Sequence, residues 1–303
     1  MQGTRWRWIA ILALALGVLV ASGCGDDDDE GGGGSAATTT TAPAEKRTFA
    51  AGTTMAKLQE AGEITIGVKY DVPPFGFKNP RSGAIEGFDV DVANAIAAEL
   101  GAKPKLIEAI SDNRIPFLKD GTADLILSTM TINAERDEEI DFSEPYFIAR
   151  GAIAVKKSDT SIKGVADLAG KKVCTVLGST YEETLKKQAP KAERVTVDTY
   201  SECLERMQNG AVDAESTDDA ILAGHIKQDP ELKVLDVRLT TEPYGAGIKD
   251  GDTAFKAFVD EALQKFKDDG RWATTYQKWV GQYTGEEQEP PTMTLKEAID
   301  LSK

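Results

Sequence analysis

The sequence predicts an α/β fold in which parallel sheets are covered by helices, and three observations support this prediction. From residue 53 onward, short apolar segments rich in isoleucine and valine alternate with segments of helical periodicity, an order that is typical of parallel sheets. The alternation occurs twice along the chain. KDGTADLILST (119–129) also resembles QNGAVDAEST (208–217), since each combines a helix end, a glycine turn, a short strand and Ser-Thr. We therefore expect two similar α/β halves.

The first half alternates strands and helices. The expected strands are EITIGV (63–68), KPKLIEA (103–109) and ADLILS (123–128), and the expected helices are FDVDVANAIAAELG (88–101) and SDNRIPFLKDG (111–121). Apolar residues recur every four positions in the first helix, and glycine follows each helix where a left-handed residue is favoured.

The second half repeats this order. Its expected strands are KKVCTV (171–176), RVTVDTY (194–200) and AVDAES (211–216), and its expected helices are STYEETLKKQ (179–188), SECLERMQNG (201–210) and TDDAILAGHI (217–226). Farther on, apolar and aromatic residues at helical spacing between positions 255 and 279 predict helices that bury this stripe in the core.

Charge and the N-terminus indicate where the protein works. The formal charge of −15 over 303 residues argues against nucleic acid as a partner. Arg5 and Arg7 precede the apolar run 9–21, and ASGC then ends at Cys24, which is similar to a lipoprotein signal. We predict a signal peptide at 1–23 and acylation of Cys24. The alternative is a plain secretory signal with an incidental cysteine.

The segment that follows is predicted to be a tether. Residues 25–46 consist of runs of aspartate, glycine and threonine that cannot form a core. We expect a lipid-anchored, disordered linker over 24–52 and a folded domain on the extracytoplasmic face of the cell membrane. In that oxidising compartment Cys174 and Cys203 are expected to form a disulfide, the alternative being two buried thiols.

Ligands of open α/β sheets bind at the carboxyl ends of the strands, so the loops there are the candidate site. In STMTINAERDEE (128–139), Asn133 is a predicted helix N-cap that places Arg136 in the first turn, near Thr131. A guanidinium, a hydroxyl and free helix amides suit a carboxylate. The alternative is that Arg136 pairs with an acid such as Asp137 or Glu139.

Two further strand ends supply polar groups. In LGSTYEE, Ser179 with Glu182, or Thr180 with Glu183, fits a capping box, and the helix start can also face an anion. In TDDA, Asp218 or Asp219 could simply cap a helix. An aspartate directed into a cleft would instead suit an ammonium group.

A carboxylate clamp together with an ammonium partner describes a site for an α-amino acid. From about residue 54 to 284 the chain resembles the extracytoplasmic amino-acid-binding proteins of bacterial ABC importers, solute-binding family 3. The segments that carry the resemblance are DVPPFGFKN, IEGFDVDVANAIAAELG, DNRIPFLKDGTADLILSTMTINAERDEEIDFSEPYF, LAGKKVCTVLGST, GAVDAESTDDAIL and KDDGRWATTYQKWVG.

The resemblance implies a two-lobe, periplasmic-binding-protein-like (type II) fold with parallel-dominated sheets and two hinge crossovers. Lobe 1 would comprise 53–145 plus 246–303, and lobe 2 would comprise 151–240. The hinges would be PYFIAR (145–150) and TEPYGA (241–246). The lobes would close on one ligand.

The resemblance also implies roles for individual residues. Arg136 and Thr131 would hold the α-carboxylate, helped by the backbone N–H of Thr180 and by its neighbour Ser179. Asp218 and the carbonyl of Thr129 would take the α-ammonium group. The motif DVPPFGFKN adds Phe75 as a ligand contact.

Two cations indicate the class of ligand. Lys69 follows the first strand and Arg114 lies in DNRIP, and members of this family that bind glutamate or aspartate have basic residues at these two places. Two converging cations favour a second carboxylate, so we predict an acidic amino acid, glutamate before aspartate. Glutamine or another polar amino acid is the alternative.

The same residues bear on other possible functions and on partners. The fold is shared with cyclohexadienyl dehydratases, but His225, the only histidine, lies in a predicted helix away from the strand ends, so we predict no enzyme. A ligand sensor would have the same site. We expect a monomer that partners with ABC transporter permease subunits and needs no cofactor or metal.

Overall fold

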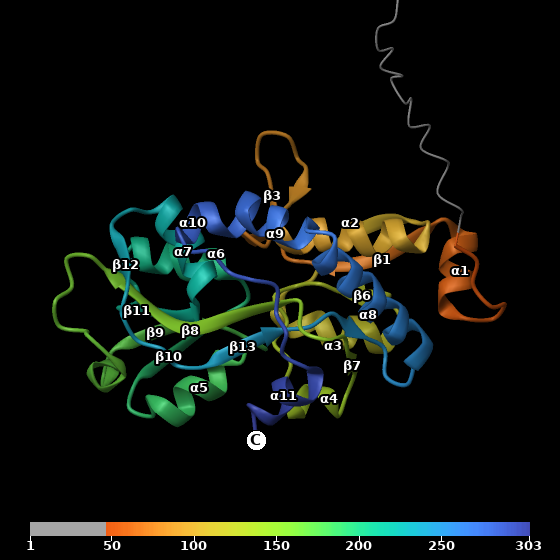
Figure 1. Cartoon of the computed structure of the whole chain (residues 1–303). Helices are drawn as coiled ribbons and strands as arrows, with labels where there is room; N and C mark the ends of the chain where they lie inside the picture. Colours follow the sequence, from red (N-terminus) through yellow and green to blue (C-terminus); the bar gives the residue numbers. More distant parts are fainter. Residues whose placement is uncertain (1–46) are drawn as a thin grey trace, which may run out of the picture. The chain divides into compact units, whose positions relative to one another are not determined.

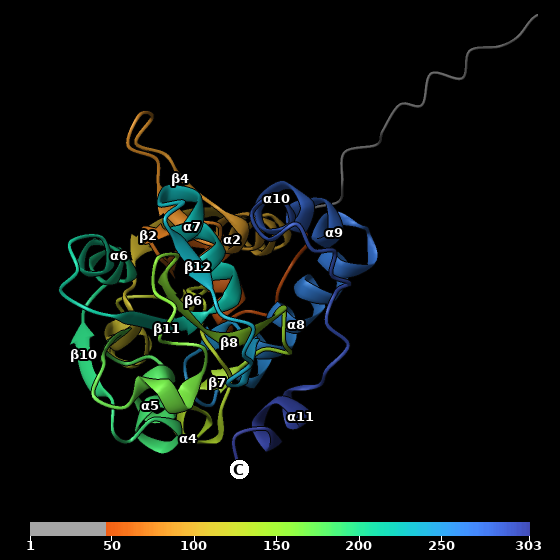
Figure 2. The same cartoon turned by 90° about the vertical axis from the view of Figure 1, so that its left-hand side faces the viewer.

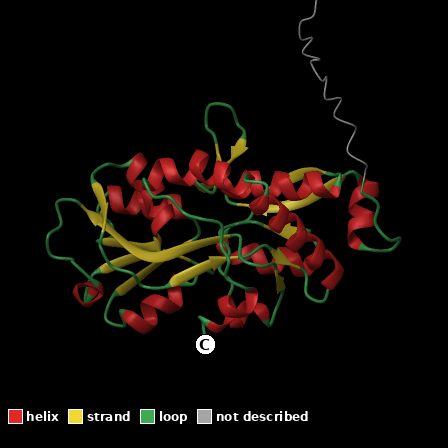
Figure 3. Cartoon of the chain, viewed as in Figure 1, coloured by secondary structure: helices red, strands yellow, loops and turns green. Residues whose placement is uncertain are grey.

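The structure is a computed structural model that describes residues 47–303, and these residues form two α/β lobes (Figures 1 and 3). The predicted signal peptide, Cys24 and most of the predicted linker lie in residues 1–46, outside the described part of the chain. No helix among residues 47–303 is long and apolar enough to span a membrane.

Lobe 1 is built on a five-stranded sheet in the order β5-β1-β6-β14-β7. The strands β1, β5 and β6 are parallel, whereas β14 is antiparallel to both of its neighbours. A small antiparallel sheet, β2-β3-β4, lies beside it. The strands of lobe 1 are β1 (Glu63–Val68), β2 (Asp71–Val72), β3 (Gly76–Lys78), β4 (Ile85–Glu86), β5 (Lys103–Glu108), β6 (Leu125–Ile126), β7 (Asp141–Phe142) and β14 (Gly247–Ile248).

The helices of lobe 1 cover this sheet, and α2 packs against α8 (Figure 1). Gly101 follows α2 in the left-handed conformation that the sequence predicts. The helical segments before the first crossover are α1 (Thr54–Ala61), α2 (Phe88–Leu100), η1 (Ser111–Asn113), α3 (Arg114–Asp120) and α4 (Ala134–Asp137). Those after the second crossover are α8 (Thr253–Asp268), α9 (Arg271–Tyr276), η3 (Gln277–Gly281), α10 (Gln282–Thr284) and α11 (Leu295–Asp300).

Lobe 2 is built on the second sheet, in the order β10-β9-β11-β8-β12 (Figure 2). Its elements are β8 (Phe147–Lys156), η2 (Val165–Leu168), β9 (Lys172–Val176), α5 (Tyr181–Gln188), β10 (Glu193–Val197), α6 (Tyr200–Gln208), β11 (Ala214–Asp218), α7 (Asp219–Gln228) and β12 (Leu232–Val234). A disulfide joins Cys174 of β9 to Cys203 of α6, as the sequence predicts.

Two extended segments connect the lobes. One is the start of β8, and the other is β13 (Thr241–Tyr244). β13 pairs antiparallel with residues 147–150 of β8, and β11 pairs antiparallel with residues 151–155. β8 therefore begins as a crossover and continues as a central strand of lobe 2.

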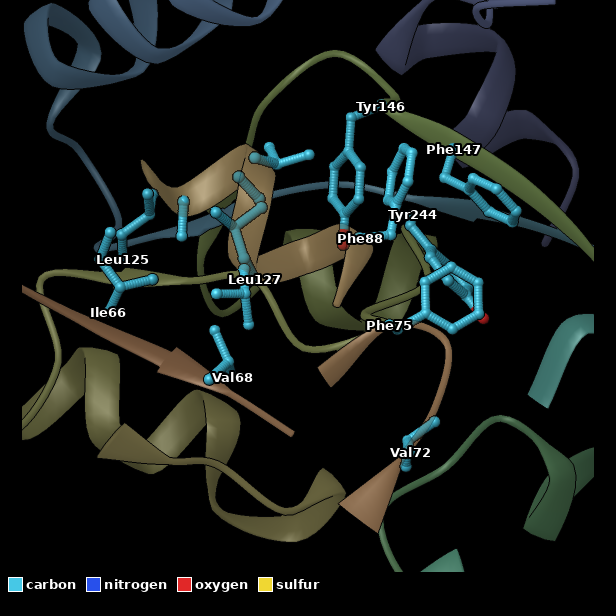
Figure 4. Packing of buried hydrophobic residues seen from close by; sticks show 14 of the residues in the cluster. Ile66, Val68, Val72, Phe75, Phe88, Leu125, Leu127, Tyr146, Phe147 and Tyr244 are labelled. Atoms are coloured by element: carbon cyan, nitrogen blue, oxygen red, sulfur yellow. The ribbon is translucent and has the colours of Figure 1, made fainter. Parts of the chain in front are cut away.

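Aromatic side chains fill the core where lobe 1 meets the crossovers (Figure 4). Phe75 makes edge-to-face contacts with Phe88, Phe147 and Tyr244, at centroid distances of 6.2, 5.0 and 5.4 Å. Trp272 of α9 is fully buried and packs on Phe88. The C-terminal aromatic stripe is thus core, as predicted.

Two local predictions are wrong in detail. The strand expected at 123–128 covers only Leu125–Ile126, and the chain turns at Thr129, which has a φ of 46°. The capping box expected at α5 does not form. The Thr180 side chain makes no cap bond, and the Glu182 carboxylate accepts instead from Gly178 N–H at 2.9 Å.

Candidate functional site

Arg136 is held at the start of α4. The Asn133 side chain caps this helix by accepting from Arg136 N–H at 2.8 Å. The guanidinium donates to the carbonyl of Thr131 at 2.7 Å and to the carbonyl of Gly178, from lobe 2, at 3.0 Å. Neither Asp137 nor Glu139 pairs with it among the described residues, so the predicted alternative of a local ion pair is not realised.

Arg114 is anchored by backbone carbonyls. Its Nε donates to Ser111 at 3.0 Å, and one terminal nitrogen donates to Ser128 and Thr129 at 2.9 and 3.1 Å. The other terminal nitrogen donates to Gly178 at 3.1 Å. Four of the five guanidinium N–H groups therefore have acceptors, which leaves one donor for a ligand.

Lys69 lies beside Arg114. Its ammonium group donates to the Ser111 hydroxyl at 2.8 Å and lies 5.6 Å from the Tyr200 ring centroid of lobe 2. Only one of its three donors has a hydrogen-bond partner among the described residues. Lys69 therefore keeps more hydrogen-bonding capacity for a ligand than Arg114 does.

Gly178 is the point where lobe 2 approaches both arginines. Its carbonyl accepts from Arg114 and Arg136, and it adopts a φ of 72°. A Cβ added there would lie only 2.6 Å from the Cα of Asp112 in lobe 1. Glycine is therefore needed both for the turn and for the contact between the lobes.

Three threonine hydroxyls meet at Glu242 of β13. Its carboxylate accepts from Thr131 of lobe 1 at 2.6 Å, from Thr180 of lobe 2 at 3.0 Å, and from Thr240 at 2.5 Å. The Glu242 side chain is buried. Nearby, the hydroxyls of Ser179 and Thr175 lie 3.3 Å apart.

Asp218 ends β11 and precedes α7, and it is buried within lobe 2. Its carboxylate accepts from the Tyr181 hydroxyl at 2.9 Å. Its neighbour Asp219 pairs instead with Arg150 at 2.7 Å, where both side chains are partly exposed. Of the two aspartates proposed from the sequence, Asp218 is thus the one directed inward.

Burial and like charges shift the pKa values of these groups. Burial, followed by the charge of Arg114, lowers the pKa of Lys69 to about 7. Burial, followed by Arg136, lowers the pKa of Arg114 to about 9. Burial, followed by the charge of Glu242, raises the pKa of Asp218 well above its usual value. An anion beside the cations and a cation beside Asp218 would both be stabilised.

A cleft of about 1080 Å³ opens between the lobes at Arg136. Thr131, Arg136, Ser179 and Thr180 line it together with Glu242. Three other predicted residues, Lys69, Arg114 and Asp218, are buried and are not among the residues that line this cleft.

The remaining predicted contacts lie elsewhere. The N–H of Thr129 donates to the buried Asp89 at 2.9 Å, and its carbonyl accepts from Arg114. Phe75 is enclosed in the aromatic core, so the structure does not place it with the polar candidates.

His225 is buried in α7, where its Nδ1 lies 2.9 Å from the Glu215 carboxylate. It does not line the cleft. Among residues 47–303, no cluster of three or more His, Cys, Asp or Glu side chains is placed to hold a metal ion.

Sequence reasoning missed Glu242, Ser111 and Tyr181. Glu242 lies in TEPYGA (241–246), which the sequence predicts only as a hinge. Ser111 and Tyr181 lie in segments that the sequence predicts only as helices. No local pattern reveals that they contact Lys69 and Asp218.

Three known proteins illustrate what the chain is similar to. It is 40% identical over 251 residues to the glutamine-binding protein of Geobacillus stearothermophilus, with 80% of this chain and 93% of the relative covered. It is 34% identical over 242 residues to the glutamate-binding protein GluB of Corynebacterium efficiens, with 75% and 81% covered. A solved structure of an ancestral arginine-binding protein bound to glutamine aligns with a TM-score of 0.70 and 40% identity, covering 73% and 98% of the two chains.

These relatives are named for the amino acids that they bind and not for a reaction. The two-lobe fold and the type II structural neighbours agree with the architecture that the sequence predicts. The family description "Bacterial extracellular solute-binding proteins, family 3" matches residues 64–282. Such proteins take a small-molecule ligand and work with transporter partners outside the cytoplasm, and this chain belongs to that family.

Proposed function

We propose that the chain is the substrate-binding protein of an ABC importer for glutamate. The observation that carries this proposal is the grouping of three buried cations. Lys69 donates to the hydroxyl of Ser111 and Arg114 donates to its carbonyl. Arg114 and Arg136 both donate to the carbonyl of Gly178. A ligand with two carboxylates would offset more of this positive charge than any other common amino acid.

The proposed ligand spans the two lobes. Arg136 and the Thr131 hydroxyl hold its α-carboxylate from lobe 1, and the N-terminus of α5 at Ser179 and Thr180 meets it from lobe 2. Asp218 takes the α-ammonium group together with the carbonyl of Thr129. We assign Phe75 to the core, because aromatic rings enclose it.

The side-chain carboxylate would reach Lys69, with Arg114 in support. Lys69 has donors to spare, whereas Arg114 is mostly engaged with carbonyls that order the loops around Ser111 and Thr129. Lys69 is therefore the residue whose charge separates glutamate from the nearly isosteric glutamine.

Glutamine is the second candidate, and two observations favour it. The relative with 40% identity is named for glutamine. A pKa of about 7 also lets the buried Lys69 become neutral, and a neutral amine can accept from an amide. Aspartate has the charges of glutamate but is one methylene shorter.

A panel of the twenty amino acids, screened by thermal shift and followed by calorimetry, tests the proposal. Wild type should bind glutamate at least roughly a hundredfold more tightly than glutamine, because a buried cation left unpaired costs several kcal/mol. Lys69→Met should remove most of this preference and spare the α-group contacts. If glutamine binds more tightly than glutamate, the acidic assignment is wrong.

We further propose that the two lobes, 53–145 plus 246–303 and 151–240, act as rigid bodies in a monomer that is anchored by lipid on Cys24. Cys24→Ala should release the protein from membranes and abolish palmitate incorporation. Retention of Cys24→Ala on membranes would contradict the anchor. Turnover of prephenate or arogenate by the purified protein would contradict a role limited to binding.

A further inference from the structure

Glu242 links both lobes and the crossover between them. One carboxylate oxygen, Oε2, accepts from Thr131 of lobe 1 at 2.6 Å and from Thr180 of lobe 2 at 3.0 Å. The other oxygen accepts from Thr240 at 2.5 Å. The residue is only 2% exposed, and its carboxylate accepts from all three hydroxyls.

The contact with Thr131 excludes another contact. A hydroxyl has one proton and donates it to one acceptor at a time. In the proposed site the Thr131 hydroxyl donates to the α-carboxylate of the ligand. It can do so only after it leaves Glu242, which means that ligand binding exchanges one carboxylate acceptor for another.

The charge of Glu242 also affects the groups that would bind the amino acid. After burial, Glu242 is the strongest influence on the pKa of Arg136, which it raises, and on the pKa of Asp218, which it also raises. Its negative charge therefore acts on both groups that would hold the α-carboxylate and the α-ammonium group of the amino acid. It attracts the Arg136 guanidinium and repels any second carboxylate placed there.

We propose that Glu242 is a specificity-determining residue, an internal carboxylate that competes with the α-carboxylate of the ligand for the Thr131 hydroxyl and for the charge of Arg136. This inference rests on the proposed amino-acid site. Glu242 thereby limits the affinity for the amino acid. The affinity should rise when the negative charge is removed and the shape of the side chain is kept.

Glu242→Gln makes that change, since the amide oxygen can still accept from the threonines. Calorimetry with L-glutamate should show binding that is tighter by roughly fivefold or more, because the acceptor that competes for the Thr131 hydroxyl no longer carries a charge. L-Isoglutamine, which has an α-amide in place of the α-carboxylate, should gain less than about twofold, because it has no α-charge to be repelled.

Glu215→Gln is the matched control. Glu215 is likewise a buried glutamate, but it lies on β11 of lobe 2, pairs with His225 and contacts none of these threonines. It should leave the affinity for both probes unchanged. If Glu242→Gln fails to fold in a thermal melt, Glu242→Asp draws the carboxylate back from Thr131 and should also tighten glutamate binding.

Unchanged or weaker glutamate binding by the folded variant overturns the inference, and so does an equal gain for isoglutamine. A wild-type protein that binds no amino acid overturns the proposed function and this inference with it. If wild type selects glutamine, the same comparison with L-glutamine and L-glutaminamide decides the role of Glu242 alone.

Discussion

Gly178→Ala should weaken glutamate binding by preventing the lobes from closing. The added Cβ would lie 2.6 Å from the Cα and 2.8 Å from the N of Asp112 in the opposite lobe. Carbon atoms in favourable contact are about 3.5–4.0 Å apart. Because both obstructing atoms belong to the backbone, no side-chain rotation relieves the clash, and the lobes must separate by about 1 Å.

The size of the effect follows from the bonds that the separation breaks. Arg114 and Arg136 donate to the Gly178 carbonyl at 3.1 and 3.0 Å, and another 1 Å or so takes both beyond hydrogen-bond range. Hydrogen bonds to charged groups contribute about 1.5–3 kcal/mol each. At the lower end the closed form loses about 3 kcal/mol, which raises the Kd for glutamate roughly 150-fold.

Gly170→Ala is the matched control. Gly170 is in the same lobe and has the same φ of 72°, but no atom lies within 4 Å of an added Cβ. Both variants bear the cost of a left-handed alanine, about 1 kcal/mol, so the difference between them isolates the contact between the lobes. Calorimetry supplies the two Kd values, and small-angle scattering should show that glutamate compacts Gly170→Ala more than Gly178→Ala. Equal Kd values would refute the reasoning.

Three further predictions concern charge, pH and the disulfide. Arg136→Ala should weaken glutamate binding by about 2–5 kcal/mol in calorimetry, because it removes a buried partner of the carboxylate, and an unchanged Kd would exclude Arg136 from the site. Glutamate affinity should fall as pH rises above about 7, because Lys69 of the ligand-free protein then loses its proton and binding must restore it. The Lys69→Met variant should lack this pH dependence. An affinity of wild type that does not change with pH would show that Lys69 does not pair with the ligand. Reduction of the Cys174–Cys203 disulfide, which closes a separation of 29 residues, should lower the free energy of unfolding by about 3 kcal/mol, and a melting temperature unaffected by reductant would contradict this.

Local patterns were sufficient for most of the fold. The four-residue periodicity and terminal glycine of α2 predict its extent to within a residue, since α2 ends at Leu100 and Gly101 is left-handed. The N-cap at Asn133 could be predicted equally well, because it is a hydrogen bond between residues only three positions apart. β6 could not, because its length depends on where the chain turns at Thr129, and Asp89, 40 positions away, holds that turn.

In the candidate site, too, features local in the sequence could be predicted and contacts between distant residues could not. Arg136 and Asp218 are candidates that the sequence alone indicates, because each lies at or beyond the end of a strand, where ligands of α/β sheets bind. The engagement of Arg114 with carbonyls from three loops could not be found, since two of those loops lie 14 and 64 positions away. Glu242 escaped notice for the same reason, because its partner Thr131 is 111 positions distant.

β8 runs without a break from the crossover into the sheet of lobe 2. It pairs with β13 over residues 147–150 and with β11 over residues 151–155, so one part of the strand lies in the crossover and the other in the sheet of lobe 2. Five residues of strand span about 16 Å, so a turn of about 10° at Gly151 moves the far end of the second part by nearly 3 Å. A bend of a few degrees where the crossover enters lobe 2 would therefore be enough to displace the far end of this strand by about the length of a covalent bond.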